Sequence, residues 1–327
     1  MSNSVQAIKL SFFSGLHIGR GAQELDKTAT IYSSDALKSA LFATGLSYYP
    51  QWAENPDAFF KGFCISSAFP WADDELFLPK PRNIRFQFES NNDITEAKQA
   101  KKIAYVSASV FRHWSAEPDH PVLVKESQIK GDAFLFAAKS KTFLHTSIQQ
   151  RVQVPTEGSG DSRPYYFERL LFEGNSGLYF FISFQDEDLK PQILHVLNLL
   201  GDMGIGTDRT VGNGQFEIEA IEPFIMPSGS RGVQMALGLY LPSRDEIGLI
   251  DLEKSYWTLV KRGGYIAAAD KEENRSLRKN NIYFFGEGST FNAALVLRGR
   301  LADLQPTVTH TVLHPVWRCG MPLFFNL

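Results

Sequence analysis

Residues 201–214 read GDMGIGTDRTVGNG, and this glycine-rich stretch is the most informative part of the chain. Glycine adopts a positive φ readily and has no Cβ, so successive backbone N–H groups can converge on an anion while Arg209 pairs with its charge. The loop therefore predicts a ligand that carries phosphate groups. The alternative is a long flexible connection, but such a connection rarely has Gly-x-Gly units on both sides of an arginine.

The segments that flank this loop define its place in the fold. Upstream, DEDLKPQILHVLNLL (186–200) has apolar residues at helical spacing. Downstream, QFEIEAIEPF (215–224) alternates as a strand does. A dinucleotide-binding fingerprint requires strand, loop and then helix, which is the opposite order, and a P-loop requires Gly-Lys-Ser/Thr, which is missing. Phosphate or nucleic-acid contact is the interpretation that remains.

The segments before the loop predict a first domain of the ferredoxin-like (RRM-like) type. Residues 8–12 alternate as a strand, and a helix begins at Ser33 or Ser34. Two strand-like pieces and the buried strand GLYFFISF (177–184) follow. With the helix and strand around the loop, the order becomes β-α-β-β-α-β. We expect this domain to span residues 1–222.

A long, basic and irregular insertion interrupts the first domain at about residues 90–176. It contains VPTEGSGDSRP (154–164), whose composition predicts a mobile loop. After a linker at 223–232, apolar residues alternate from Val233 onward and mark a second unit, at 233–327. We therefore expect an α+β fold with two tandem ferredoxin-like domains.

Composition limits the class of protein. The 327 residues are 43% hydrophobic, and a net charge of −3 counts against a free-standing nucleic-acid binder. Cys64 and Cys319 have no histidine or cysteine at ligand spacing, so we expect no metal and no cofactor. No apolar run approaches the ~20 residues of a membrane helix, and the N-terminus lacks a signal-peptide pattern. We expect a cytoplasmic protein without membrane contact.

Local charge differs from this overall balance. Basic residues outnumber acidic ones between residues 98 and 151, whereas residues 73–75 and 186–188 are acidic. One face of the protein can therefore bind a polyanion while the acidic segments face elsewhere. A solvated surface explains such charge runs equally well.

Five stretches carry a resemblance to a known family: FFSGLHIGRG (12–21), IYSSDALKSAL (31–41), FLPKP (77–81), GIGTDRTVGNGQFEI (204–218) and HPVWRCGMPLFFNL (314–327). Together they resemble the RAMP-superfamily subunit of type III-A (Csm) CRISPR–Cas effector complexes that binds the crRNA 5′ tag, the fourth subunit of the Csm family. The resemblance reaches both ends of the chain and is weak over 90–175. It implies a non-catalytic subunit that holds the repeat-derived tag, contacts the large polymerase-cyclase subunit and adjoins the first RAMP backbone subunit.

The resemblance and the chemistry of the loops give a set of expected RNA-binding residues. The loop glycines would bring main-chain donors to the tag, Arg209 would pair with a phosphate, and Thr207 and Asn213 would bond a 2′-hydroxyl or a base edge. The loop at residues 14–26, called the first loop, and the helix that follows it would form the opposite wall of the RNA-binding site. The expected residues are His17, Gly19, Arg20, Lys38, Gly204, Gly206, Thr207, Arg209, Gly212, Asn213 and Gly214.

His17 has a second interpretation, because some RAMP relatives cleave repeat RNA with a histidine near a glycine-rich loop. The protein would then be a metal-independent endoribonuclease. No lysine or tyrosine constellation around His17 is visible in the sequence, so we expect binding without catalytic residues. A mononucleotide-binding enzyme is a third, weaker possibility.

The expected protein-partner surface combines an acidic segment with a proline-rich corner. Acidic side chains are unsuited to RNA, and rigid prolines preorganise a contact surface. The expected interface residues are Asp73, Asp74, Glu75, Pro79, Lys80 and Pro81.

Overall fold

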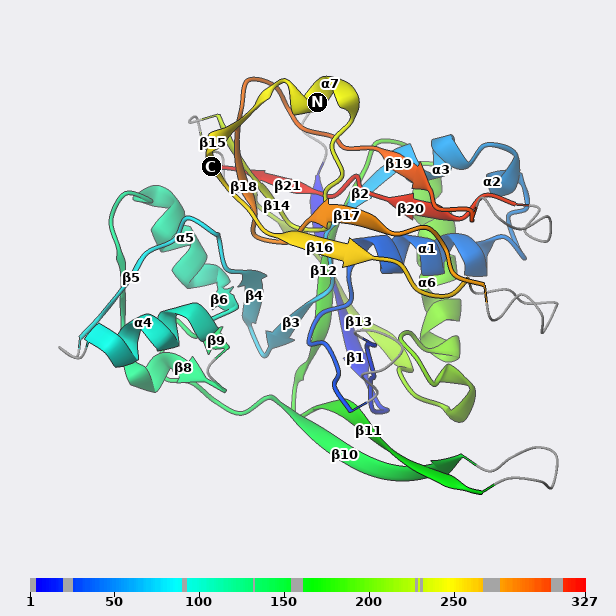
Figure 1. The fold of residues 1–327 in the computed structure, drawn as a ribbon, viewed down its shortest axis with the longest axis horizontal. Helices are drawn as coiled ribbons and strands as arrows, with labels where there is room; N and C mark the ends of the chain where they lie inside the picture. Colours follow the sequence, from blue (N-terminus) through cyan, green and yellow to red (C-terminus); the bar gives the residue numbers. More distant parts are fainter. Residues whose placement is uncertain are drawn as a thin grey trace.

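The computed structural model describes residues 4–19, 26–89, 93–131, 133–153, 161–226, 229, 232–266, 277–306 and 314–327. A nine-stranded sheet runs through the first part of the chain (Figure 1). Its strands are β1 (Val5–Phe12), β2 (Phe63–Ile65), β3 (Phe69–Ala72), β4 (Glu75–Pro79), β6 (Tyr105–Ser107), β8 (Ile129–Lys130), β9 (Phe134–Leu135), β12 (Ser176–Phe184) and β13 (Phe216–Phe224). They lie in the order β13-β1-β12-β3-β4-β6-β9-β8, and β2 also pairs with β12.

Strands β1 and β12 place the candidate site, because β1 leads into the first loop. β1 pairs antiparallel with β12 on one side and with β13 on the other. All residues of β12 are buried, as its uninterrupted apolar sequence predicts. Successive side chains of a strand point to opposite faces, so the two strands contribute to two different cores.

One face of β1 and β12 is covered by two helices, α1 (Ser34–Gly45) and α6 (Leu189–Met203), which pack against each other. Leu37 of α1, Val196 of α6 and Leu10 of β1 belong to one buried cluster. The short helices α2 (Gln51–Glu54) and α3 (Pro56–Lys61) follow α1. Among the described residues, no helix is long and apolar enough to cross a membrane.

The opposite face of β1 and β12 packs against residues 233–327, called here the second part of the chain. Phe181 of β12 lies 5.7 Å from Phe325, measured between ring centroids. Ala7 of β1, Met235 and Leu237 belong to the same buried cluster. The two parts therefore share a hydrophobic core.

The second part contains a four-stranded sheet in the order β15-β18-β14-β21. Its strands are β14 (Val233–Ala236), β15 (Ile250–Tyr256), β18 (Thr290–Ala293) and β21 (Phe324–Asn326). The other elements are α7 (Arg244–Ile247), the pair β16 (Leu259–Arg262) and β17 (Ile282–Phe285), and the pair β19 (Leu301–Asp303) and β20 (Trp317–Cys319). Neighbouring strands of the sheet run antiparallel.

The expectation of an irregular segment at about 90–176 is wrong for the part that the structure describes. It contains α4 (Asp93–Lys102), α5 (Ala108–Ala116), β7 (Val122–Val124) and the 3-10 turn η1 (Glu126–Gln128), and β7 pairs with β5 (Phe86–Phe88). It also contains a hairpin of two ten-residue strands, β10 (Leu144–Gln153) and β11 (Arg163–Phe172). Phe111 and Trp114 of α5 are buried in the cluster that also contains Ala7 and Phe325, and the Phe111 and Phe325 ring centroids lie 5.5 Å apart, so this segment packs into the shared core. In Figure 1 the hairpin extends from the lower side of the molecule. The expected mobile loop falls largely on 154–160, outside the described residues.

Candidate nucleic-acid interface

The glycine-rich loop follows α6 and folds back on itself. Gly204, Gly206, Gly212 and Gly214 all have positive φ, and Asp208 adopts the left-handed conformation before the 3-10 turn η2 (Arg209–Val211). A Cβ on Gly214 would lie 1.9 Å from the carbonyl oxygen of Ile205, which no side chain tolerates. The glycines are therefore required by the close packing of the loop.

The structure brings the glycine-rich loop and the first loop together. The Thr207 N–H donates to the His17 carbonyl oxygen at 2.9 Å, and the Gly214 N–H donates to the Gly15 carbonyl oxygen at 2.9 Å. A Cβ on Gly206 would lie 2.3 Å from the same His17 oxygen. The two loops thus form one hydrogen-bonded unit.

This arrangement corrects the expected role of Gly212 and Gly214 as main-chain donors to RNA. The Gly212 N–H donates to the Arg209 carbonyl oxygen, and the Gly214 N–H is used by the first loop. Because both donors already have partners within the chain, they are not free to bind a phosphate. What the glycines achieve is to hold Arg209 on a rigid turn.

His17 does not line the surface of this unit. Its side chain is fully buried, its ring stacks on Phe167 with 4.4 Å between centroids, and its Nδ1 lies 2.6 Å from the Glu168 carbonyl oxygen. Its Nε2 is buried without a hydrogen-bond partner in the part of the chain that the structure describes. The expectation that His17 contacts RNA is wrong for this arrangement, and so is its placement as a catalytic base within reach of an RNA strand.

The hairpin of β10 and β11 is the third component, and the sequence reasoning missed it. Leu16 and Leu170 exchange backbone hydrogen bonds of 2.9 and 2.7 Å, which tie β11 to the first loop. Arg151 of β10 pairs with Asp208 of the glycine-rich loop, and its guanidinium lies 4.4 Å from the Phe167 ring centroid. The available signal was the high content of aromatic and apolar residues in PYYFERLLF (164–172), which is typical of strands, within a segment of basic and irregular composition.

Lys38 is also buried, with 1% of its surface exposed. Its ammonium group donates to the carbonyl oxygens of Phe60 and Phe63 at 2.7 and 2.6 Å, and it lies 4.4 Å from the Phe63 ring centroid. The expected contact of Lys38 with RNA is therefore wrong. Its position on the inward face of α1 lets it link that helix to the last turn of α3 and the start of β2.

The surface that remains for a ligand is small. Gly19, Thr207 and Arg209 are exposed, whereas Asn213 is 4% exposed and its amide lies 3.5 Å from the Asp208 carboxylate. Arg20 lies outside the described residues. Of the expected RNA-binding side chains, Arg209 is the described one that combines charge with exposure.

The expected partner surface divides into two parts. Asp73 and Asp74 are exposed in the turn between β3 and β4, with Asp73 paired to Lys141. Glu75 is half-buried, and burial raises its pKa. This acidic turn remains accessible to another molecule.

The proline corner, in contrast, is an internal feature. Pro79 and Pro81 are buried, so they present no contact surface in the isolated chain. The Lys80 ammonium donates to the Ala100 carbonyl oxygen at 2.8 Å, and burial lowers its pKa to about 8. The expected interface role of these prolines is wrong, because both side chains are buried within the chain.

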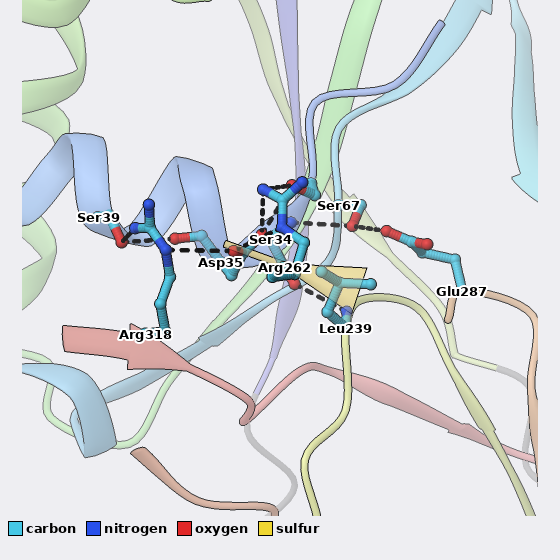
Figure 2. A network of polar contacts seen from close by, with 9 residues as sticks. Ser34, Asp35, Ser39, Ser67, Leu239, Arg262, Glu287 and Arg318 are labelled. Carbon is cyan, nitrogen blue, oxygen red and sulfur yellow. Dashed lines mark hydrogen bonds and ion pairs between the residues drawn. The ribbon is translucent and has the colours of Figure 1, made fainter. Parts of the chain in front are cut away.

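A polar network at the start of α1 is the second feature that the sequence reasoning missed (Figure 2). The carboxylate of Asp35 is fully buried and accepts hydrogen bonds from Nε and Nη2 of Arg262, both at 3.0 Å. Nε of Arg318 lies 3.6 Å away, and the Ser33 hydroxyl donates at 2.7 Å. Burial alone would raise the pKa of Asp35, but the two arginines and Ser33 outweigh it and hold that pKa below its usual value.

This Asp35 network joins the two parts of the chain. Arg262 lies in β16 and Arg318 in β20, whereas Asp35 belongs to the first turn of α1. The neighbouring Ser34 hydroxyl accepts from the Leu239 N–H at 3.0 Å. No local pattern in the sequence marks Asp35, because its partners Arg262 and Arg318 are remote in sequence.

Comparison with known proteins agrees with this architecture. Residues 230–327 match the family model described as the CRISPR Csm4 C-terminal domain. A protein of Thermococcus onnurineus named CRISPR system Cms protein Csm4 is 28% identical over 244 residues, which cover 71% of each chain. A protein of the same name from Streptococcus thermophilus is 24% identical and covers 96% of each.

Solved structures show the same fold over nearly the full length. A chain of the crystal structure of the Csm3-Csm4 subcomplex in the type III-A CRISPR-Cas interference complex superposes with a TM-score of 0.65, at 19% identity and 99% coverage of both chains. A chain of the Csm1-Csm4 cassette in complex with cA4 gives a TM-score of 0.61, at 21% identity, covering 99% of this chain and 98% of the other. The chain thus matches the Csm4 C-terminal domain over residues 230–327, is similar to curated proteins named Csm4, and shares its fold with chains of the Csm3-Csm4 and Csm1-Csm4 assemblies.

Proposed function

We propose that the chain is a structural, RNA-binding subunit of a type III-A (Csm) CRISPR–Cas interference complex. It bridges the large polymerase-cyclase subunit to the RAMP backbone subunits and holds the 5′ repeat-derived tag of the crRNA. The observation that carries this proposal is the full-length match to chains of two assemblies, one named for Csm3 with Csm4 and one for Csm1 with Csm4. As part of such a complex the protein would act in the cytoplasm.

The proposed contact with the tag centres on Arg209. Its turn is fixed by hydrogen bonds from the glycine-rich loop to the first loop and by the pairing of Asp208 with Arg151 of the hairpin. A cation held in one place loses little conformational freedom when it binds a phosphate, so the bond contributes more of its energy to affinity. With a net charge of −3, the lone chain should bind RNA weakly and with a strong salt dependence, and tight retention should require its partners.

The proposed contact with the large subunit lies at the acidic turn of Asp73, Asp74 and Glu75. Two of these carboxylates are exposed, and one cation, Lys141, is paired with them. An acidic surface repels RNA and steers a basic protein surface. The buried prolines Pro79 and Pro81 are not part of this surface.

We also infer that each part of the chain is a ferredoxin-like unit, with boundaries near 1–222 and 233–327. Sheet order supports this inference. β2 and β3 both pair with β12 and are counted here as one strand, so the first unit has the order fourth, first, third, second strand. The order β21-β14-β18-β15 repeats this arrangement in the second unit. All these neighbours pair antiparallel, as the ferredoxin-like pattern requires.

Co-purification of the assembled complex tests the function. The chain is coexpressed with a tagged large subunit, a backbone subunit and crRNA, and protein and RNA are measured separately. Arg209→Glu should reduce crRNA retention by roughly 10–100-fold at moderate salt, through a lost charge-assisted bond and added repulsion, while the protein subunits still copurify. Arg244→Glu, an equally exposed arginine on α7, serves as the matched control.

A second variant separates the two proposed surfaces. Charge reversal at Asp73, Asp74 and Glu75 should release the large subunit and leave RNA contact at Arg209 intact. If Arg209→Glu instead releases the large subunit, or if neither variant changes what copurifies, the assigned surfaces are wrong.

A further inference from the structure

Exposed aliphatic side chains gather where α7 meets the end of β18. Ile247 is the last residue of α7 and Leu249 belongs to the turn after it, whereas Leu295 and Val296 follow β18. In this order their exposed fractions are 56%, 37%, 62% and 69%. A single exposed apolar residue needs no explanation, but a contiguous group marks an interaction site. These four residues are called the aliphatic patch.

The two segments that carry the aliphatic patch are joined at both ends. The Ala294 N–H lies 3.5 Å from the Leu249 carbonyl oxygen, where β15 and β18 pair. At the other end, the Glu246 carboxylate accepts a hydrogen bond from the Gly299 N–H at 3.0 Å. The four patch residues lie at or between these contacts, so they belong to one surface although the two segments are remote in sequence.

A buried polar side chain fixes the backbone beneath the patch. Gln234 is 4% exposed, and its amide donates to the Leu295 carbonyl oxygen at 2.7 Å and accepts from the Leu297 N–H at 2.9 Å. Leu297 itself is buried. The backbone is therefore held on both sides of Val296, and the patch is presented to solvent by a fixed segment. A surface that is rigid before binding loses little conformational freedom when a partner binds.

The chemistry of the patch favours a protein partner over RNA. Single-stranded RNA is bound by stacking on aromatic rings and by cations at its phosphates, and the patch side chains have neither a ring nor a charge. The buried centre of a protein–protein interface is apolar, and arginine is enriched in such interfaces. Arg298 and Arg300 are exposed and follow the patch in the sequence. The complementary partner surface is therefore apolar, with carboxylates at its edge.

We propose that the aliphatic patch docks the RAMP backbone subunit through such an apolar, acid-edged surface. The inference rests on the proposed function, because a bridge needs a separate surface for each of its two protein partners. The acidic turn at 73–75, assigned to the large subunit, requires a basic surface, which is the opposite of what the patch requires. In Figure 1, α7 lies at the top of the molecule, above β3 and β4, which carry the acidic turn. The two surfaces can therefore bind different partners at the same time.

Leu295→Glu tests the docking surface by coexpression with a tagged backbone subunit in the absence of crRNA. The substitution places a charge inside an apolar contact, so recovery of the chain with the backbone subunit should fall roughly tenfold or more. Because Leu295 is exposed, the melting temperature of the lone chain should stay within about 2 °C of that of the wild type. Val296→Glu, at the neighbouring exposed position, should have the same effect, which guards against a folding defect in one variant.

Leu123→Glu is the matched control, since Leu123 lies in β7 and is 65% exposed. It should leave the recovery of both protein subunits unchanged. Arg298→Gln tests the acidic edge of the partner. It should lower recovery of the backbone subunit at low salt and have little effect at high salt, where the ion pair is screened. Equal recovery of Arg298→Gln and wild type at low salt would contradict a partner with carboxylates at that edge.

Purification of the assembled complex separates this inference from the proposed function. If the wild type copurifies with both protein subunits and Leu295→Glu still retains the backbone subunit, the docking surface is wrong and the proposed function stands. If the wild type does not link the two subunits, the proposed function itself fails. Three other results would each give the patch a different occupant and overturn the proposal: release of the large subunit instead, loss of tag RNA alone, or dissociation of a dimer of the lone chain by Leu295→Glu.

Discussion

Replacement of Asp35 by asparagine should destabilise the protein strongly. The substitution preserves shape but removes the negative charge that compensates Arg262 and Arg318. Because the carboxylate is fully buried and makes a two-bond contact with Arg262, the appropriate comparison is a broken buried ion pair, which costs about 3–5 kcal/mol. A loss of this size is a large fraction of the free energy of unfolding of a typical protein.

Urea denaturation of the lone chain, followed by fluorescence and by circular dichroism, measures this cost. Asp57→Asn is the control, since Asp57 forms an exposed pair with Lys61 at 2.5 Å and such pairs contribute at most about 0.5 kcal/mol. The pH dependence has a defined sign. The pKa of Asp35 is lowered in the folded state, so its contribution is complete above its ordinary value of 3.8 and is lost as the pH falls through the lower, folded-state value.

The difference in unfolding free energy between wild type and Asp35→Asn should therefore be constant near neutral pH and shrink in strong acid. A cost no larger than that of Asp57→Asn would refute the view that this carboxylate holds the two parts of the chain together. A difference that grows as the pH falls below 3.8 would contradict the assigned sign of the pKa shift.

Two further substitutions address the loops and the helix. Gly206→Val should detach the glycine-rich loop, because its Cβ would lie 2.3 Å from the His17 carbonyl oxygen; hydrogen exchange at Thr207 should accelerate, and unchanged protection would show that the contact is dispensable. Lys38→Met should leave two buried carbonyl oxygens without a donor and cost about 1–3 kcal/mol in denaturant unfolding, with tag-RNA affinity unchanged; a selective loss of RNA affinity would restore Lys38 as a contact residue.

Periodicity and glycine placement allowed much of the fold to be predicted. The apolar run of β12 and the helix before the glycine-rich loop form the expected elements, because their burial follows from local sequence alone. The hairpin of β10 and β11 was missed because its apolar residues occur in short runs between charged and polar residues and show no strand periodicity. Phe167, which stacks on His17, and Leu170, which belongs to the first hydrophobic cluster, both give that hairpin buried contacts.

The candidate site was harder to predict, since side-chain direction depends on tertiary packing. Arg209 is exposed as expected, but His17 and Lys38 point inward. The His17 ring nitrogen lies beside the Glu168 carbonyl oxygen, and the Lys38 ammonium donates to the Phe60 carbonyl oxygen. A histidine or lysine beside a glycine-rich loop looks the same in sequence whether it faces solvent or a neighbouring strand. The Asp35 network was invisible for a related reason, because no local pattern links an acid in one helix to arginines in two distant strands.

The long reach of the Asp35 contacts has a consequence for how the protein is made. Asp35 is synthesised 227 residues before its partner Arg262. At ~5–20 residues per second, the ribosome needs roughly 10–45 s to deliver that partner, and Arg318 comes later still. During this interval Asp35 has neither arginine to pair with, so burying its carboxylate costs free energy. The first part of the nascent chain should therefore stay loosely folded until the last strands emerge. The ion pairs thereby delay closure of the molecule until the whole polypeptide is present.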